Sequence, residues 1–98
     1  MLTGKQKRYL RSLANQMEAV IQVGKGGVTD TVVSALDQAL TARELVKVRV
    51  LNNCHDPAAQ VGKELAEQAG AELVQQLGQK LTFFRVNPEN PIHQLPGE

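Results

Sequence analysis

Hydrophobic residues along this chain recur at two different periods, and the pattern predicts alternating helices and strands. Leucine and methionine recur at helical spacing in the first segment, which indicates a helix from the N-cap Thr3 to about Met17. An apolar run over about 19–23 predicts a strand, and a second helical pattern covers about 29–42. The positions expected to face inward are Leu10, Leu13 and Met17 in the first helix and Val32, Val33, Leu36, Ala39 and Leu40 in the second.

In the strand predicted over 45–51, apolar and polar residues alternate from Val46 to Val50, as in a half-buried strand. Three valines would face one side of the sheet, while Lys47 and Arg49 would face the other. The alternation predicts a sheet that helices cover on one face and that is wet on the other. Lys47 and Arg49 either extend a binding surface on that open face or only keep it soluble, and the pattern does not decide between these.

Capping and turn residues punctuate the second half of the chain. Asp56 is expected to cap a third helix that has Pro57 in its first turn and ends at Gly70. Strands over about 71–77 and 80–86 flank a tight turn and are expected to form an antiparallel hairpin.

These elements predict an α/β fold, a small two-layer sandwich with a mixed four-stranded sheet, in the order α-β-α-β-α-β-β. Residues 1–88 would form one domain, and the proline-bearing residues 89–98 an irregular C-terminal tail. The order of the strands in the sheet cannot be read from the sequence.

Composition limits the class of protein. The chain has 98 residues, 42% hydrophobic and 21% charged, which is typical of a single globular domain. It has neither a long apolar run nor a charged-then-apolar leader, so we expect no membrane span and no secretion. The single cysteine cannot form an internal disulfide, and a cytoplasmic location is expected.

Charge is distributed unevenly. Within residues 1–28 the only acidic residue is Glu18, so the net charge of +1 conceals a basic segment followed by a more acidic remainder. The basic residues of this segment are Lys5, Lys7, Arg8, Arg11 and Lys25.

A glycine-rich turn opens onto the second helix, at Gly24, Lys25, Gly26 and Gly27. Glycines allow close approach of a ligand to the backbone, and the unpaired N–H groups of a helix start favour anions. A nucleotide-binding P-loop does not fit, because Asp30 occupies the position of its lysine. A dinucleotide fingerprint does not fit either, because Thr29 occupies the position of its third glycine.

What remains is a Gly-x-x-Gly loop that clamps a sugar-phosphate backbone, or a simple strand-to-helix turn. The helix that follows, Lys25 and the basic first helix favour the clamp. Only Tyr9, Phe83 and Phe84 are aromatic, so contact with the RNA backbone is expected to outweigh base stacking.

Three stretches of the chain resemble one family. They are LTGKQKRYLR from Leu2, VGKGGVT from Val23 and ELVKVRVLN from Glu44, with GAELVQQLG from Gly70 as further support. Together they are similar to the CRM-domain family of RNA-binding proteins, in particular its single-domain bacterial YhbY-type members, over residues 2 to about 88.

The resemblance implies a fold like the C-terminal domain of bacterial initiation factor three and an association with precursors of the large ribosomal subunit. It also implies an RNA partner. In this chain the family's RNA-contacting loop falls on residues 24–27, and its basic helix signature falls on Lys5, Lys7, Arg8 and Arg11.

Catalysis and metal binding have little support in the sequence. Adjacent Cys54 and His55 lack a third group to orient them, and with Asp56 and the distant His93 they do not match the spacing of a metal site. We therefore expect no enzyme activity, no cofactor and no small-molecule substrate.

Two functions remain open at this point. One is a non-catalytic RNA-binding protein that uses the loop and the basic helix. The alternative is a protein-interaction module that docks on a ribosomal or other protein through the open sheet face.

Overall fold

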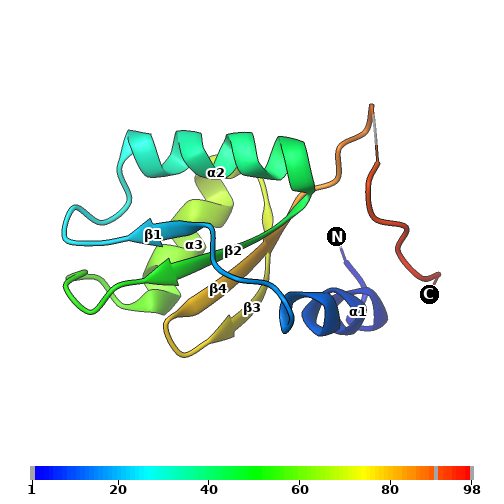
Figure 1. The fold of residues 1–98 in the computed structure, drawn as a ribbon, viewed down its shortest axis with the longest axis horizontal. Coiled ribbons are helices and arrows are strands. Elements are labelled where there is room, and N and C mark those ends of the chain that lie inside the picture. The colour runs from blue at the N-terminus through cyan, green and yellow to red at the C-terminus, as the bar shows by residue number, and fades with distance from the viewer. Residues whose placement is uncertain (1, 90, 98) are drawn as a thin grey trace.

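The structure is a computed structural model that describes residues 2–89 and 91–97, and these form three helices around a four-stranded sheet (Figure 1). The element order and the mixed sheet confirm the predicted fold class. The elements are α1 (Gly4–Ala14), β1 (Ile21–Val23), α2 (Asp30–Arg43), β2 (Leu45–Val50), α3 (Ala58–Ala69), β3 (Glu72–Leu77) and β4 (Lys80–Phe84). None of the described helices is long and apolar enough to cross a membrane.

The strands lie in the order β1-β2-β4-β3. β1 pairs in parallel with β2, whereas β4 runs antiparallel to both β2 and β3. The predicted hairpin of the last two strands is confirmed, and its turn contains Gly78 at a φ of 59°, a conformation that glycine adopts without steric cost. β1 is therefore a short edge strand, and the glycine-rich loop follows directly from it.

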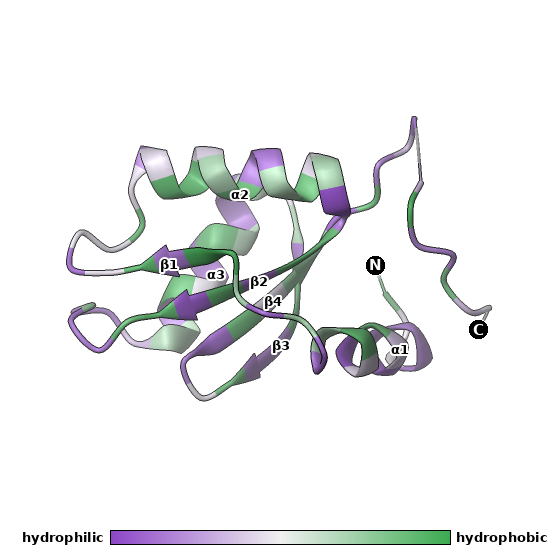
Figure 2. Cartoon of the chain, in the orientation of Figure 1, coloured by the Kyte–Doolittle hydropathy of each residue, from purple (hydrophilic) through white to green (hydrophobic). Residues whose placement is uncertain are grey.

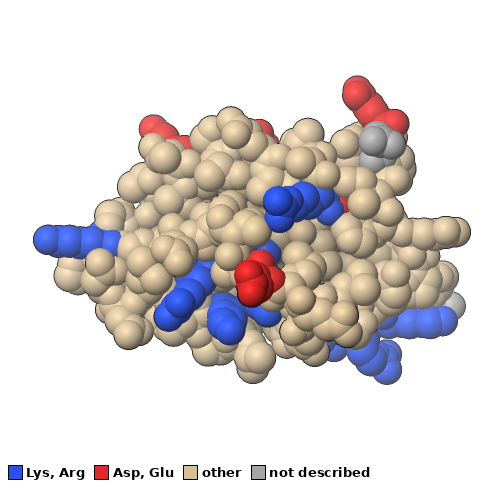
Figure 3. All heavy atoms as spheres, viewed as in Figure 1, with Lys and Arg blue, Asp and Glu red and all other residues tan. Residues whose placement is uncertain are grey.

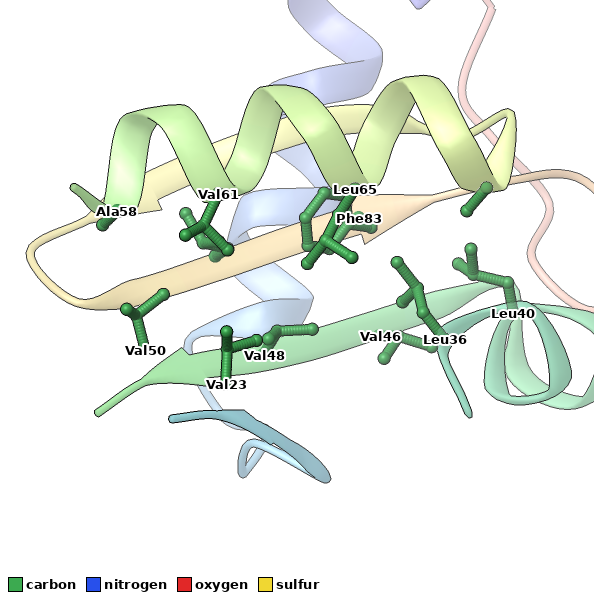
Figure 4. Close-up of a cluster of buried hydrophobic side chains, with 12 residues drawn as sticks. Val23, Leu36, Leu40, Val46, Val48, Val50, Ala58, Val61, Leu65 and Phe83 are labelled. Carbon is green, nitrogen blue, oxygen red and sulfur yellow. The ribbon is translucent and has the colours of Figure 1, made fainter. Parts of the chain in front are cut away.

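The main core lies between the sheet and the helices α2 and α3. The valines of β2 point toward both helices, as the alternating pattern predicts (Figure 4). The hydrophobic segments of α2 lie mostly on its side toward the sheet (Figure 2). Full burial of one such side chain contributes about 1.5–3 kcal/mol. The central members of this cluster are Val23, Leu36, Leu40, Val46, Val48, Val50, Val61, Leu65, Leu81 and Phe83.

The helix α1 packs on the other face of the sheet and forms a second, smaller core. Leu10 contacts a cluster that contains Leu45, Val74 and Phe84. A bulge in β3 between Leu73 and Gln75 shifts the pairing register, and Val74 at this point belongs to the small core. The expectation of a wet face therefore holds only for part of the sheet. We call the exposed part, with Arg49, Leu77 and Lys80, the open half of the sheet.

The first helix ends three residues earlier than predicted. It stops at Ala14, because Gln16 and Met17 form turn bonds to carbonyls three residues back instead of continuing the helix. The Lys47 ammonium then donates to the carbonyl oxygens of Ala14 at 3.0 Å and Met17 at 3.3 Å. A cation at this position satisfies free carbonyls and complements the helix dipole. Lys47, a residue of β2, therefore caps the C-terminal end of α1.

The predicted cap of the third helix is wrong. Pro57 is the N-cap of α3, with an extended ψ of 148°, and no side chain caps the helix there. Asp56 precedes the cap and does not reach the helix N–H groups. The predicted end is confirmed: Gly70 adopts the left-handed conformation, and its N–H donates to the Ala66 carbonyl.

The described residues after β4 contain no helix or strand, but the buried Glu44 holds them against the domain. Its carboxylate accepts hydrogen bonds from the backbone N–H groups of Asn87 at 2.6 Å and of Ile92 at 2.8 Å. It also accepts one from the His93 N–H at 2.7 Å and lies 3.2 Å from Nδ1 of the His93 ring. The tail therefore has a fixed course without secondary structure.

Candidate nucleic-acid interface

Residues 24–27, which we call the GKGG loop, form a turn between β1 and α2. The Gly27 N–H donates to the Gly24 carbonyl at 3.0 Å, and Gly27 has a φ of 67°, which favours glycine. Gly27 is buried, whereas Lys25 and Gly26 are exposed at the tip. The turn therefore fixes the loop from within and presents two residues to solvent.

Only some N–H groups of this region can meet a ligand. Gly27 uses its N–H within the turn, and the Thr29 hydroxyl caps the N–H of Val32 at 3.2 Å. The N–H groups of Lys25 and Gly26 donate no hydrogen bond within the described chain. The loop amides are therefore open donors. At the start of α2 the Thr29 side chain occupies the N–H of Val32, whereas the N–H groups of Asp30 and Thr31 donate no hydrogen bond within the described chain.

A second loop, residues 51–57, lies beside the GKGG loop (Figure 1). A Cβ atom built on Gly24 would lie 3.4 Å from Oδ1 of Asn53, and one built on Gly27 would lie 3.3 Å from Oδ2 of Asp56. Asp56 thus brings negative charge to the Gly27 side of the loop. An anion can approach more favourably on the side of Lys25 and Gly26.

The four basic residues predicted on the first helix are all located on α1. Lys5 and Arg8 are exposed, Lys7 and Arg11 are half-buried, and none of the four forms an ion pair with a described residue. Cations that the fold does not neutralise are available to an anionic partner.

The start of α1 contains a motif that the sequence reasoning missed. The Thr3 hydroxyl accepts from the Gln6 N–H at 3.1 Å, and the Gln6 side chain accepts from the Thr3 N–H at 3.0 Å. This is a capping box, and the spacing of Thr3 and Gln6 in the sequence was its signal. It fixes the beginning of the basic helix.

The structure does not bring the two basic elements together. The GKGG loop and α1 lie at opposite ends of the long axis, which extends over 39 Å (Figure 1). Lys and Arg side chains also occur between these ends along the lower border of the face in Figure 3, with an acidic side chain among them. Any ligand that contacts both elements must therefore be long.

The open half of the sheet contributes two of the intervening cations. Arg49 of β2 and Lys80 of β4 are exposed and stand directly opposite each other in the antiparallel register. Like charges in that position destabilise a sheet, and neither residue has an ion-pair partner among the described residues. Lys47, on the same face, is not available in the same way because its ammonium is bound to the end of α1.

Cys54 and His55, the adjacent pair considered for catalysis and metal binding, have different surroundings. Cys54 is half-buried and packs against the main core, while His55 is exposed. Among the described residues there is no group of three or more His, Cys, Asp or Glu side chains placed to hold a metal ion.

Comparison with known proteins identifies the class to which this fold and surface belong. Residues 2–85 match the CRS1 / YhbY (CRM) domain. The chain therefore belongs to the CRM-domain family.

Individual relatives cover almost the whole chain. The chain is 44% identical over 96 residues to the "Probable RNA-binding protein YqeI" of Bacillus subtilis, covering 98% of this chain and 100% of that protein. It is 32% identical over 88 residues to the "Probable RNA-binding protein PA4753" of Pseudomonas aeruginosa, covering 90% and 85%.

A solved structure shares the fold. The solution structure of the hypothetical protein SAV1595 from Staphylococcus aureus matches with a TM-score of 0.82 and 44% identity, covering 98% of this chain and 100% of that one.

Proposed function

We propose that this protein is a non-catalytic RNA-binding protein whose GKGG loop and basic helix α1 contact the RNA backbone. The observation that carries the proposal is the tip of the loop, where two N–H groups without an internal partner lie beside the exposed Lys25. Membership of the CRM-domain family, in which the relatives above carry the name "Probable RNA-binding protein", supports RNA as the partner.

The loop suits a phosphate for steric and electrostatic reasons. Gly26 has no side chain to hold a phosphate away from the backbone, and oriented N–H groups bind phosphate oxygens well. The Lys25 ammonium adds a mobile positive charge. Asp56 disfavours an anion on the Gly27 side, so the phosphate is expected on the outer side of the tip.

The RNA would continue from the loop across the open half of the sheet toward α1. Arg49 and Lys80 lie on that part of the sheet, and Lys5 and Arg8 are exposed on the helix. Each neutralised phosphate releases counterions, so the logarithm of the affinity is expected to fall with the logarithm of salt concentration by about 0.7 per contact on single strands, or 0.9 on duplex.

The loop is tested by two substitutions that the structure indicates will fold. Lys25→Glu and Gly26→Asp alter the exposed tip, whereas a substitution of Gly27 would be strained by its positive φ. We expect each to weaken binding of ribosomal RNA fragments at least tenfold in a filter-binding titration, because a carboxylate would stand where a phosphate binds.

Two controls accompany this test. Lys63→Glu makes the same change of charge at an exposed position of α3, and Gly26→Ala adds bulk without charge. Lys63→Glu is expected to leave affinity nearly unchanged. Equal losses of RNA affinity in Lys63→Glu and Lys25→Glu would show that binding depends on the net charge of the protein and not on the loop. Negligible RNA affinity of the unaltered protein at low salt would favour the alternative, a module that docks on a protein through the open half of the sheet.

The RNA that we propose is a precursor of the large ribosomal subunit, which also entails a cytoplasmic location. This part of the proposal rests on the family resemblance. Crosslinking in cells, followed by sequencing of the attached RNA, is expected to recover large-subunit precursor RNA. Recovery of other RNAs alone would contradict the ribosomal role and leave RNA binding intact.

A further inference from the structure

The three aromatic residues of the chain have very different surroundings. Phe83 and Phe84 are buried in the two cores, with 0% and 5% of their surface exposed. Tyr9 is 38% exposed on the outer side of α1. It is therefore the aromatic ring in this chain that a ligand can reach.

Tyr9 lies in a shallow hollow of about 520 Å³, which we call the Tyr9 hollow. Its other lining residues are Lys5, Arg8, Ser12 and Pro96. The lining therefore combines an aromatic ring and a proline with two cations, and it contains no acidic residue.

The C-terminal tail supplies one wall of this hollow. The Gln6 side chain donates to the Pro96 carbonyl at 3.1 Å, and Leu95 packs against the small core beneath α1. Glu44 fixes the preceding part of the tail through the backbone of Ile92 and His93. Pro96 is thus held beside α1 by the hydrogen bond to its own carbonyl and by the packing of its neighbour Leu95.

We propose that the Tyr9 hollow binds an unpaired nucleobase, which stacks on Tyr9 while Lys5 and Arg8 neutralise the adjacent phosphates. The inference rests on the proposed function and makes it more specific, because it selects single-stranded RNA. A flat aromatic ring beside two cations matches the two parts of a nucleotide, a base with an exposed π-face and an anionic linkage. Bases within a duplex have both faces covered and cannot stack there.

The composition of the chain provides a direct probe of this contact. Tyr9 is the single tyrosine and the chain has no tryptophan, so its ultraviolet fluorescence comes from the proposed site. Titration with single-stranded oligouridylate is expected to quench this emission, after correction for absorption by the RNA. A duplex RNA of equal length that binds comparably through its backbone is expected to leave the emission nearly unchanged.

Substitutions separate stacking from charge. Tyr9→Leu removes the ring and is expected to weaken oligouridylate binding roughly 5- to 150-fold, the range of one base–aromatic stack. Tyr9→Phe retains the ring and is expected to bind nearly as the unaltered protein does. Neither change should alter the salt slope, whereas Lys5→Ala should reduce it by about 0.7.

The outcomes distinguish this inference from the proposed function. Unchanged tyrosine emission and equal affinity of Tyr9→Leu, with binding still dependent on Lys25, would overturn the stacking contact and leave backbone binding standing. Absence of RNA binding by the unaltered protein would overturn both. A loss in Tyr9→Leu that appears equally with duplex RNA would also overturn the inference, since a duplex offers no free base. Circular dichroism of each variant establishes that α1 is intact.

Discussion

Glu44 is buried, charged and in a backbone conformation, with a φ of 64°, that non-glycine residues seldom adopt. Such a conformation persists where surrounding contacts compensate for its cost. Here the N–H of Glu44 ends α2 by donating to the Leu40 carbonyl at 2.8 Å, and the Glu44 carbonyl accepts from the backbone N–H of Arg85 at 3.0 Å. The positive φ thus lets the chain turn from α2 into β2 while the carboxylate points at the tail.

The environment of this carboxyl group determines its protonation. Burial on its own would raise the pKa of Glu44, but the N–H groups of Asn87, His93 and Ile92, with the His93 ring, stabilise the charged form. Their combined effect holds the pKa below its ordinary value of 4.5. Because the pKa is lower in the folded state, the carboxylate stabilises the fold above that ordinary value and ceases to do so as the pH falls through the lowered one.

Glu44→Gln tests how much the charge of this carboxylate contributes to stability, because glutamine has nearly the same shape as glutamate. The amide cannot accept charge-assisted hydrogen bonds, so we expect the free energy of unfolding at pH 7 to fall by about 1.5–3 kcal/mol. The measurement is urea unfolding at pH 7 and again near pH 3, where the difference between the two proteins should shrink. Glu67→Gln, at an exposed position of α3, is the control. A difference that stays constant with pH would show that the charge of Glu44 is not what matters.

At the scale of secondary structure, the two faces of β2 have different roles. On one face its valines build the main core. On the other face Lys47 caps the C-terminal end of α1, and Arg49 stands opposite Lys80 of β4. An opposed pair of like charges costs the sheet stability, so it is expected to reflect a requirement other than folding.

Arg49→Thr separates binding from stability. Threonine favours strands and removes the repulsion, so we expect the free energy of unfolding to stay constant or to rise by about 0.2–1 kcal/mol. RNA affinity is expected to fall, with a salt slope smaller by about 0.7 on single strands. Chemical denaturation and filter binding at several salt concentrations measure the two quantities. A less stable protein with unchanged affinity would assign Arg49 a structural role instead.

At the scale of the whole molecule, the GKGG loop and α1 are far apart, so the affinity is expected to depend on the length of the RNA. A short oligonucleotide can occupy one end, whereas a longer strand can engage both and gain from effective concentration. We expect a strand of about 20 or more nucleotides to bind at least a hundredfold more tightly than one of about 4.

Variants at either end are expected to remove that gain. Arg8→Glu and Lys25→Glu should each reduce the affinity for the long strand, and the affinity ratio of long to short strands should fall in both. The measurement is competition between long and short oligonucleotides at a fixed salt concentration. A ratio that is unchanged in Arg8→Glu would mean that RNA does not reach α1.

Local rules account for the features that the sequence predicts correctly. Thr3 caps the first helix and Gly70 ends the third, because each acts on backbone groups a few residues away. The alternation of β2 likewise identifies its buried face. The placement of residues 24–27 between a strand and a helix is also confirmed, whereas their contact with RNA stays a prediction.

The features that were missed depend on partners distant in the chain. Lys47 meets the end of α1 across 33 residues, and Glu44 meets His93 across 49 residues. No spacing rule connects such pairs before the fold is known. The position of Asp56 before a proline predicts a helix cap, but Pro57 is the N-cap and the Asp56 carboxylate lies near Gly27.

The paths of both chain ends have a practical consequence for studying this protein. Residue 2 bonds to Glu72 of β3, and the tail passes beside α1, so both ends of the described chain lie at the same end of the molecule, away from the GKGG loop (Figure 1). A fusion at the C-terminus would extend from the tail that lines the Tyr9 hollow, and a fusion at either terminus would lie away from the GKGG loop. RNA titrations of a fused protein would therefore underestimate binding at the Tyr9 hollow relative to binding at the GKGG loop. The tag should be cleaved before titration.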